Sequence, residues 1–339
     1  MIARISHSLI RLAVFAYLVP SMMAGVCAAA ETTQQDFPTW LAGLKVAARA
    51  HGISDASFNA ALDGVQPISR VLDLDRQQPE FTLDFPQYLE RVVSPERVAK
   101  GRKLIAIHRS VLSHVAARYH VPAPVVAAMW GIETDYGRVT GGFPVFGALV
   151  TLAYDGRRSA YFRDELINAL RIVDESGVAP SRMTGSWAGA MGQCQFMPST
   201  YLKYAQSWSG TGRADIWGKA EDVFASAANY LEQLGWNKSE LWGRAVKIRD
   251  TLDPSLFGLD VKKSVTEWAR LGVRRADGGP LPKSAIPASL IRADSKTGGA
   301  QTPGPAYLVY DNFRVLMKWN RSTYFALAAG TLADRLTRR

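Results

Sequence analysis

The amino-acid sequence predicts a mainly α-helical protein of the α+β class, with a small β-rich part near its C-terminal end. Two observations support this prediction. Apolar residues recur at three- and four-residue spacing in several segments that begin or end with helix-capping residues. Between residues 245 and 311 the pattern changes to short alternating runs, which are typical of strands. Within that region, residues 277–305 are crowded with proline and glycine, which predicts loops.

The first strong helical signal begins at Ser94 and Pro95, an N-cap followed by proline at the first helical position. Pro122 and Pro124 end this helix and start the next, which carries residues 129–133. We expect one continuous first helix, with an apolar stripe formed by Leu104, Ile107, Val111 and Val115.

Two later segments are also expected to be helical. Residues 221–234 are followed by Gly235 as a stop signal, and residues 322–336 form an amphipathic segment close to the C-terminus. Between them, RAVKIRD (244–250) and AYLVYDN (306–312) alternate as strands do.

The N-terminus has the three-part pattern of a secretory signal. Residues 1–11 are positively charged, residues 12–19 are apolar, and small residues then lead to Glu31. We therefore predict that residues 1–30 are a cleaved signal peptide. The alternatives are an uncleaved membrane anchor and lipid attachment at Cys27, although the valine before that cysteine fits a lipid site poorly.

Charge and cysteine content restrict the class of partner and cofactor. The formal net charge of +10 favours an anionic partner. Basic residues are dispersed and no strand interleaves them with aromatics, so no nucleic-acid partner is expected. Cleavage after Ala30 would leave Cys194 alone, and the five histidines form no HxxxH pair. We therefore expect neither a disulfide, nor a metal, nor another cofactor.

An acid stands out in the segment MWGIETDYG (129–137). Glu133 falls on the helical stripe that Met129 and Trp130 are expected to bury. Burial, the negative end of the helix dipole, and like charge from Asp135 would all raise its pKa, so that the carboxyl could stay protonated near neutral pH and act as an acid. The alternative is a helix-end glutamate that turns to solvent.

A second motif is the glycine-rich stretch TGSWAGAMGQCQFMPSTY (184–201). Its glycines could let the backbone approach a bulky ligand, and Ser186, Gln193 and Gln195 suit hydroxyl- and amide-bearing partners. The alternative is a turn that stabilises a helix junction before Pro198. The GSWAG sequence is not a GxSxG nucleophile elbow, so a serine hydrolase is not predicted.

Five separated motifs together resemble the membrane-bound lytic murein transglycosylase B family in order and spacing, over roughly residues 36–336. The motifs are WGIETDYG (130–137), YDGRR (154–158), GSWAGAMGQCQFMPSTY (185–201), AANYL (227–231) and KWNRSTYF (318–325). The resemblance implies a core similar to goose-type lysozyme, with an additional helical domain and a small β-rich subdomain.

The resemblance also implies a division of the chain after the signal peptide. An N-terminal helical domain (31–125) would be completed by the C-terminal helix (322–339). The catalytic core (126–244) and the β-rich subdomain (245–311) would follow, and residues 312–339 would return to the core.

The implied activity is cleavage of the β-1,4 bond between N-acetylmuramic acid and N-acetylglucosamine in peptidoglycan, with a 1,6-anhydro end as the product. The family's single catalytic acid falls on Glu133. It would protonate the glycosidic oxygen while the muramoyl acetamido group steadies C1, and the resulting carboxylate would then take the O6 proton.

Eight further residues match substrate-binding positions of the family: Ser186, Gln195, Phe196, Met197, Tyr230, Asn320, Arg157 and Arg158. The first two match polar groups that contact the sugar or its acetamido group, and Phe196 and Met197 match the cleft wall. The arginines match a pair that faces the peptide stem, whose carboxylates suit guanidinium groups. The alternative for each residue is a structural role, above all for Tyr230, whose neighbours on the helix are apolar.

The chain departs from the family at two places. Some relatives carry an acidic calcium loop where this chain has SWSGTGRADIW (207–217), with hydroxyls in place of carboxylates, so calcium is not expected. Trp319 and Phe325 stand where relatives can carry tyrosines.

The implied partners are peptidoglycan glycan strands and their stem peptides. We expect a periplasmic monomer, loosely associated with the cell envelope. Two other functions stay open: a lysozyme-type hydrolase with Asp135 as its second carboxylate, and a glycan-binding protein without activity.

Overall fold

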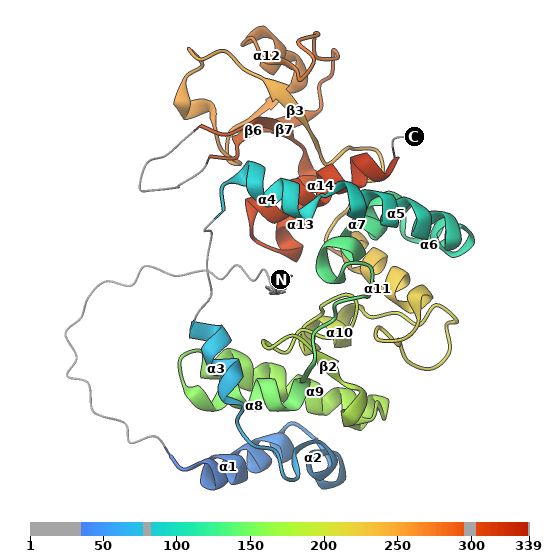
Figure 1. The fold of residues 1–339 in the computed structure, drawn as a ribbon, viewed down its shortest axis with the longest axis vertical. Helices are drawn as coiled ribbons and strands as arrows, with labels where there is room; N and C mark the ends of the chain where they lie inside the picture. The colour runs from blue at the N-terminus through green and yellow to red at the C-terminus, as the bar shows by residue number, and fades with distance from the viewer. Residues whose placement is uncertain (1–34, 77–82, 295–302, 338–339) are drawn as a thin grey trace, which may run out of the picture.

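The computed structural model describes residues 35–76, 83–294 and 303–337. The predicted signal peptide (1–30), with the lipid alternative at Cys27, lies outside the described residues. Within them, helices dominate and one small sheet forms a separate layer, which confirms the predicted fold class (Figure 1).

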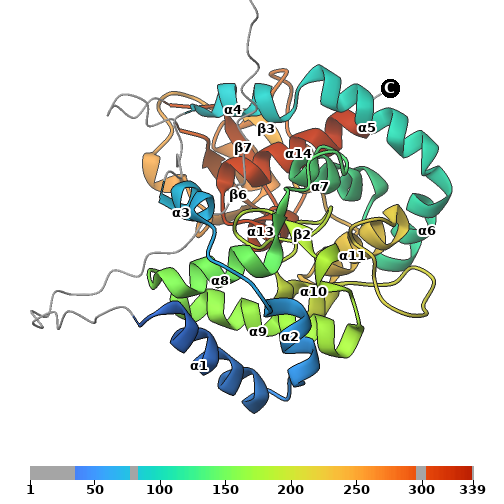
Figure 2. The same cartoon turned by 60° about the horizontal axis from the view of Figure 1, so that its bottom comes forward.

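The helices of the first half are α1 (Phe37–Ala50), α2 (Asp55–Leu62), α3 (Ser69–Arg76), α4 (Phe85–Val92), α5 (Pro95–Ile107), α6 (Arg109–Tyr119), α7 (Ala123–Thr134), α8 (Val145–Asp155) and α9 (Ser159–Ser176). Those of the second half are α10 (Pro198–Tyr204), α11 (Ala220–Gln233), α12 (Val265–Arg270), α13 (Asp311–Trp319) and α14 (Thr323–Thr337). Figure 2 shows α7 near the centre, with α14 and α5 on one side of it and the α8–α9 pair below.

The single helix expected from residue 95 to residue 121 is in fact two helices. The chain breaks at His108 (φ −94°, ψ 19°), and Ile107 is 62% exposed instead of lying on a buried stripe. The reason is a change of partner, because α5 packs against α7 and α14 whereas α6 packs mainly against α11. The His108 ring fills the corner between them, edge-on to Phe224 at 5.3 Å.

The last helix also differs from its expected amphipathic form. Helix α14 contacts α4, α5, α7 and α13, and apolar side chains are buried on most of its circumference. It is therefore a central helix. At Gly330 the absence of a side chain admits the ring of Trp242, because a Cβ there would lie 2.2 Å from the indole. This contact joins the helical core to the chain that enters the sheet.

The sheet has the strand order β4-β6-β7-β3-β5 and is antiparallel throughout. Its strands are β3 (Gly243–Lys247), β4 (Lys262–Ser264), β5 (Arg274–Arg275), β6 (Pro287–Arg292) and β7 (Ala306–Val309). A two-stranded pair, β1 (Phe143–Pro144) with β2 (Thr184–Gly185), lies in the helical part. The segments predicted as strands, 244–250 and 306–312, coincide with β3 from its second residue on and with all of β7.

Strand β6 was missed, because residues 277–305 were expected to be loops. Four consecutive residues, 288–291, are buried, so the strand has no alternating pattern. Leu290 packs in a cluster with Trp268 of α12, whereas Ile291 faces the main core. The strand is thus covered on both faces, so its sequence does not alternate between apolar and polar residues.

Helix α7 begins after Pro122, as predicted, and ends in an unusual turn. Asp135, Tyr136 and Gly137 all have positive φ (49°, 59° and 79°). This turn folds Tyr136 back between two helices, where its ring lies against Gly101 of α5 and Gly131 of α7. The hydroxyl of Tyr136 donates a hydrogen bond to the carbonyl of Arg97 (3.0 Å). The end of α7 is therefore locked by packing.

Gly101→Ala should lower the free energy of unfolding by about 1–3 kcal/mol, because overpacking a fitted site forces its neighbours to move. The added Cβ would lie 2.1 Å from the Tyr136 hydroxyl and 2.6 Å from the Leu336 side chain. Urea denaturation measures this change.

The matched control is Gly43→Ala, also inside a helix, where a Cβ would meet nothing within 4 Å. That change should raise stability by up to about 1 kcal/mol through helix propensity. Equal effects at the two sites would contradict the packing argument.

Candidate active site

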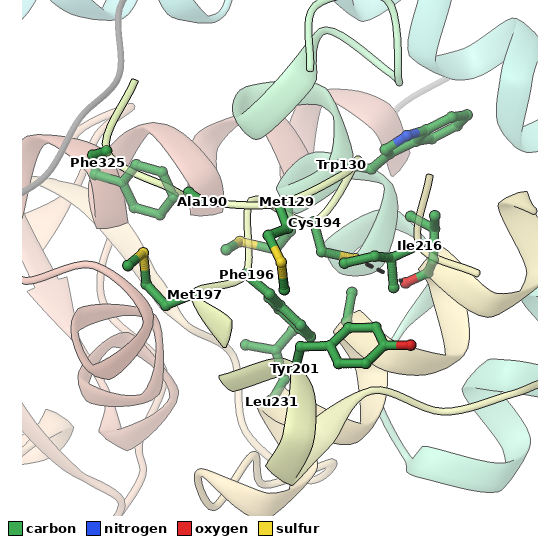
Figure 3. Packing of buried hydrophobic residues seen from close by; sticks show 14 of the residues in the cluster. Met129, Trp130, Ala190, Cys194, Phe196, Met197, Tyr201, Ile216, Leu231 and Phe325 are labelled. Carbon is green, nitrogen blue, oxygen red and sulfur yellow. Dashed lines mark hydrogen bonds between the residues drawn. The ribbon is translucent and has the colours of Figure 1, made fainter. Parts of the chain in front are cut away.

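Glu133 lies in the last turn of α7. The residue as a whole is only partly buried, but its carboxyl group is enclosed by protein atoms. Nine other residues line a small space beside it, which is too small for a water molecule: Val126, Met129, Trp130, Gln193, Cys194, Val223, Phe224, Ala227 and Trp319. Figure 3 shows Met129, Cys194 and Phe196 close together in the buried layer of this region.

The surroundings of Glu133 favour its protonated form. Burial raises its pKa to about 8, and a hydrogen bond from the Trp319 indole opposes this rise without cancelling it. The Trp319 Nε1 donates to the Glu133 Oε1 at 2.8 Å. At neutral pH the group can therefore donate a proton, and once ionised it can accept one.

Asp135 does not contribute to this pKa in the way expected from the sequence. Its carboxylate pairs with three cations: Lys100 at 3.2 Å, Arg97 at 3.7 Å, and Arg138. Burial alone would raise the pKa of Asp135, but the hydrogen bonds from Arg138 and Lys100 lower it overall. The expectation of like-charge repulsion on Glu133 is thus wrong, because three basic side chains compensate the charge of Asp135.

A cluster of aromatic rings extends from Glu133. Trp319 packs on Tyr230 with 4.9 Å between ring centroids, and Phe196 contacts both rings at about 5.5 Å. Tyr204 of α10 extends the cluster, 4.4 Å from Tyr230. Burial, with smaller contributions from Tyr204 and Glu133, raises the pKa of Tyr230 to about 12. The structure therefore brings Phe196 and Tyr230, both named from the sequence, next to the acid through Trp319.

The glycine-rich stretch forms a tightly wound loop. Its glycines permit backbone-to-backbone approach within the protein, since a Cβ at Gly185 would lie 1.9 Å from the carbonyl oxygen of Ala190. Gln193 bridges the loop to the site: it accepts from the Trp130 indole (2.8 Å) and donates to the carbonyl of Trp217 (2.9 Å). The glycines therefore allow the loop to pack tightly on itself.

Two polar side chains of this loop, Ser186 and Gln195, make hydrogen bonds within the protein and still have a donor or an acceptor available. The Ser186 hydroxyl accepts from the backbone amides of Ala188 and Ala190 and retains its own proton to donate. The Gln195 amide donates to the carbonyls of Thr140 and Gly192, and no described residue donates to its carbonyl oxygen. Gln195 adopts a left-handed backbone (φ 51°).

The remaining residues named from the sequence lie further along the same elements. Met197, 8% exposed, caps the N-terminus of α10. Asn320 follows Trp319 at the end of α13, and its side-chain oxygen accepts from the Ser322 amide (3.0 Å). The hydrogen bond to Glu133 comes from Trp319, the neighbour of Asn320.

Arg157 and Arg158 share one internal partner. Both guanidinium groups bind the carboxylate of Asp75 in α3, a residue only 3% exposed. The Arg158 side chain is 22% exposed, and its other face lies over the Phe162 ring. The Arg157 side chain is 54% exposed, so it retains a surface that an external carboxylate could reach. The pair ties α3 to the turn between α8 and α9.

Two residues that interact with the acid, one by a hydrogen bond and one through its charge, were not identified as site residues from the sequence. Trp319 was noted only as a departure from relatives, although its place beside Asn320 in a motif was a usable signal. Tyr88 of α4 is 5% exposed, and its hydroxyl has no hydrogen-bond partner among the described residues. Burial and then the charge of Glu133 raise the pKa of Tyr88, which places it in the electrostatic surroundings of the acid. Nothing in the sequence connects α4 to Glu133.

The segment 207–217 is built from internal hydrogen bonds. The Ser207 and Ser209 hydroxyls lie 3.0 Å apart, and both donate to the carbonyl of Thr211. Asp215 pairs with Arg182 at 2.9 Å. Across the described residues, no three His, Cys, Asp or Glu side chains are placed to hold a metal ion together.

Comparison with known proteins adds to this geometry. The transglycosylase SLT domain family matches residues 36–334. The chain is 30% identical to the membrane-bound lytic murein transglycosylase B of Escherichia coli K12 over 295 residues, which is 84% of this chain and 78% of that protein.

Solved structures of similar proteins include ligand complexes. The chain resembles SltB3 of Pseudomonas aeruginosa bound to NAG-NAM-pentapeptide (43% identity, TM-score 0.84, 90% of this chain and 80% of that one). SltB3 has also been solved with NAG-anhNAM-pentapeptide. The E. coli lytic transglycosylase Slt35 in complex with calcium is similar at 27% identity (TM-score 0.73, 90% and 94% covered).

The raised pKa of Glu133 predicts a pH dependence of stability. Between its ordinary value of 4.5 and about 8, the unfolded chain loses this proton while the folded chain keeps it. Ionisation therefore favours the unfolded state, and wild-type stability should fall relative to Glu133→Gln as the pH rises through this window, by at most about 1.4 kcal/mol per pH unit. Urea denaturation at several pH values measures the difference.

Glu90→Gln, which removes an exposed carboxyl from α4, is the control and should not show this slope. A constant difference between wild type and Glu133→Gln from pH 5 to pH 8 would mean that the Glu133 carboxyl is solvated.

Proposed function

Because the chain belongs to the family of the transglycosylase SLT domain and is a lytic transglycosylase acting on peptidoglycan, we propose that it cleaves the β-1,4 bond between N-acetylmuramic acid and N-acetylglucosamine without water, forming 1,6-anhydromuramoyl ends. The observation that carries this proposal is a single carboxyl, that of Glu133, enclosed and held protonated near neutral pH. The residues that line its space include no second acid.

The proposed reaction uses Glu133 twice. As an acid it gives its proton to the glycosidic oxygen while the bond from that oxygen to C1 of the muramoyl residue breaks, with the substrate's own acetamido group stabilising C1. As a carboxylate it then removes the proton from the O6 hydroxyl, and O6 forms the new bond to C1. The proton balance is zero, so the enzyme is ready for the next turnover.

Two features favour this route over hydrolysis with Asp135. The Asp135 carboxylate is held by Lys100, Arg97 and Arg138, so it is not free to activate a water. A ligand of SltB3, NAG-anhNAM-pentapeptide, contains the anhydro group that this route produces.

Two side chains of the glycine-rich loop have hydrogen-bonding groups that could bind polar groups of the substrate. Ser186 retains a hydroxyl proton, which suits a carbonyl acceptor such as that of an acetamido group. Gln195 retains a carbonyl oxygen, which suits a hydroxyl or amide donor. The proposed substrate-binding set also includes Phe196 and Met197 as the wall of the cleft. Its last two members are Tyr230 and Asn320.

The place of action follows from the substrate. Peptidoglycan lies outside the cytoplasmic membrane, and residues 1–30 have the pattern of a cleaved export signal. We therefore place the enzyme in the periplasm, as a monomer loosely associated with the envelope. No helix in the described part of the chain is both long enough and apolar enough to cross a bilayer.

Glu133→Gln should abolish turnover, by at least about a hundredfold, while binding of glycan strands persists, because the amide keeps the shape of the acid and has no transferable proton. Mass spectrometry of digested peptidoglycan measures turnover, and co-sedimentation with intact peptidoglycan measures binding. The wild type should release fragments lighter by one water than those of a hydrolase. Fragments with reducing ends, or a variant active within a few-fold of wild type, would contradict the proposal.

Arg157→Ala should raise KM for peptide-bearing strands several-fold and leave KM unchanged for strands stripped of their peptides. The Arg157 guanidinium binds Asp75 but is 54% exposed, so a stem carboxylate can reach its outer side, whereas Arg158 holds Asp75 from a more buried position. Steady-state assays on the two substrates measure the difference. An equal change on both would assign Arg157 to the fold alone.

A further inference from the structure

Helix α13 ends with Trp319, whose indole contacts the acid. Its Nε1 lies 2.8 Å from Oε1 of Glu133. Across the described residues, no other hydrogen bond reaches either oxygen of that carboxyl. One oxygen is therefore held, and the other is left for the substrate.

The indole is fixed by contacts from two other elements. Tyr230 of α11 packs along it at 4.9 Å, and Phe196 of the glycine-rich loop lies against it at 5.5 Å. Phe196 is almost fully buried and Tyr230 is largely buried, so the ring has little freedom to turn its N–H away. The direction of the N–H is thus set by the fold.

An indole N–H can donate a hydrogen bond but cannot accept one. The oxygen that it contacts must therefore be the accepting oxygen in both protonation states of Glu133. A protonated carboxyl has one carbonyl oxygen and one hydroxyl oxygen, and the carbonyl oxygen is the stronger acceptor, so a donor fixed at Oε1 favours the form with the proton on Oε2. We propose that Trp319 is a positioning residue that confines the transferable proton of Glu133 to Oε2. This inference rests on the proposed role of Glu133 as the acid.

The same contact assists the second half of the reaction. When Glu133 is ionised, the bond from Trp319 becomes charge-assisted and stronger, which stabilises the carboxylate without occupying Oε2. Oε2 is then the oxygen that receives the O6 proton. One donor thus fixes both the release site and the return site of the proton.

Three titratable groups whose pKa is affected by the charge of Glu133 stay neutral over the range in which it titrates. They are Tyr88 of α4, Cys194 of the glycine-rich loop and Tyr230 of α11. Burial raises the pKa of all three, that of Tyr230 to about 12. A titration near pH 8 that is felt at the Trp319 indole therefore reports on Glu133.

The first test uses the intact protein and does not depend on turnover. With ¹⁵N-labelled indoles, the nine tryptophans give side-chain N–H signals that can be followed from pH 6 to pH 10. The Trp319 signal, identified by its loss in Trp319→Phe, should move downfield with a midpoint near pH 8 and stay constant in Glu133→Gln. If Trp319→Phe fails to fold, the signal whose titration disappears in Glu133→Gln identifies it. A Trp319 signal that is constant in the wild type overturns the proposal.

The second test is the pH profile of Trp319→Phe, which keeps an aromatic ring and removes the N–H. The activity of a general acid is lost as the pH rises through its pKa, and removal of a donor to the carboxylate raises that pKa. The alkaline limb of kcat/KM should therefore move up by about one pH unit. At neutral pH, kcat should fall about tenfold and KM should change less than about twofold.

The control is Trp268→Phe, which also removes a buried indole N–H bond, to the carbonyl of Ala288 (2.9 Å), but in the separate core of the sheet. It should lower Tm without moving the pH profile. A Trp319→Phe enzyme with an unmoved limb and a raised KM would show a sugar-stacking role only, and would overturn the proposal. If wild-type digests lack anhydro ends, the proposed function fails, whereas the indole titration still tests the contact between Trp319 and Glu133.

Discussion

The cost of keeping a carboxyl group out of water is the constraint on which the site depends. An isolated carboxylate inside a protein is strongly disfavoured, so the buried group stays protonated until the pH is well above its ordinary pKa. At Glu133 the enclosing residues supply this effect, and the pKa is raised to about 8. One hydrogen bond, from Trp319, opposes the rise, so the carboxyl can both lose and regain a proton near neutral pH.

The helical scaffold has to bring distant parts of the chain to this carboxyl. Helix α7 supplies Glu133, α13 supplies Trp319 from 186 residues away, and α11 supplies Tyr230. The central helix α14 packs on α7 and holds its direction. At the end of α7 three residues with positive φ reverse the chain, and Tyr136 anchors the reversal between two glycines. Rigid packing around α7 thus positions the acid.

The fold gives some carboxyl groups near the site basic partners and leaves Glu133 without one among the residues that line its space. Asp135, two residues from the acid, is surrounded by basic side chains, and its pKa is lowered overall. Asp75 is deeply buried and is paired with Arg157 and Arg158. Glu133 has no basic partner among the residues that line its space. Two carboxyls close in sequence therefore have opposite pKa shifts because one faces cations and the other faces apolar atoms.

Local patterns in the sequence determined the helical class, the start of α7 at its prolines, the stop of α11 at Gly235 and the placement of Glu133 on an apolar stripe, because caps and periodicity act over a few residues. Only the tertiary structure decided the break at His108, the double burial of β6, the pairing of Asp135 and the contact of Trp319 with the acid. Each of these depends on which distant element packs nearby. Burial, and with it a pKa, depends on all the elements that exclude water from a group, and the spacing of residues along one helix does not specify them.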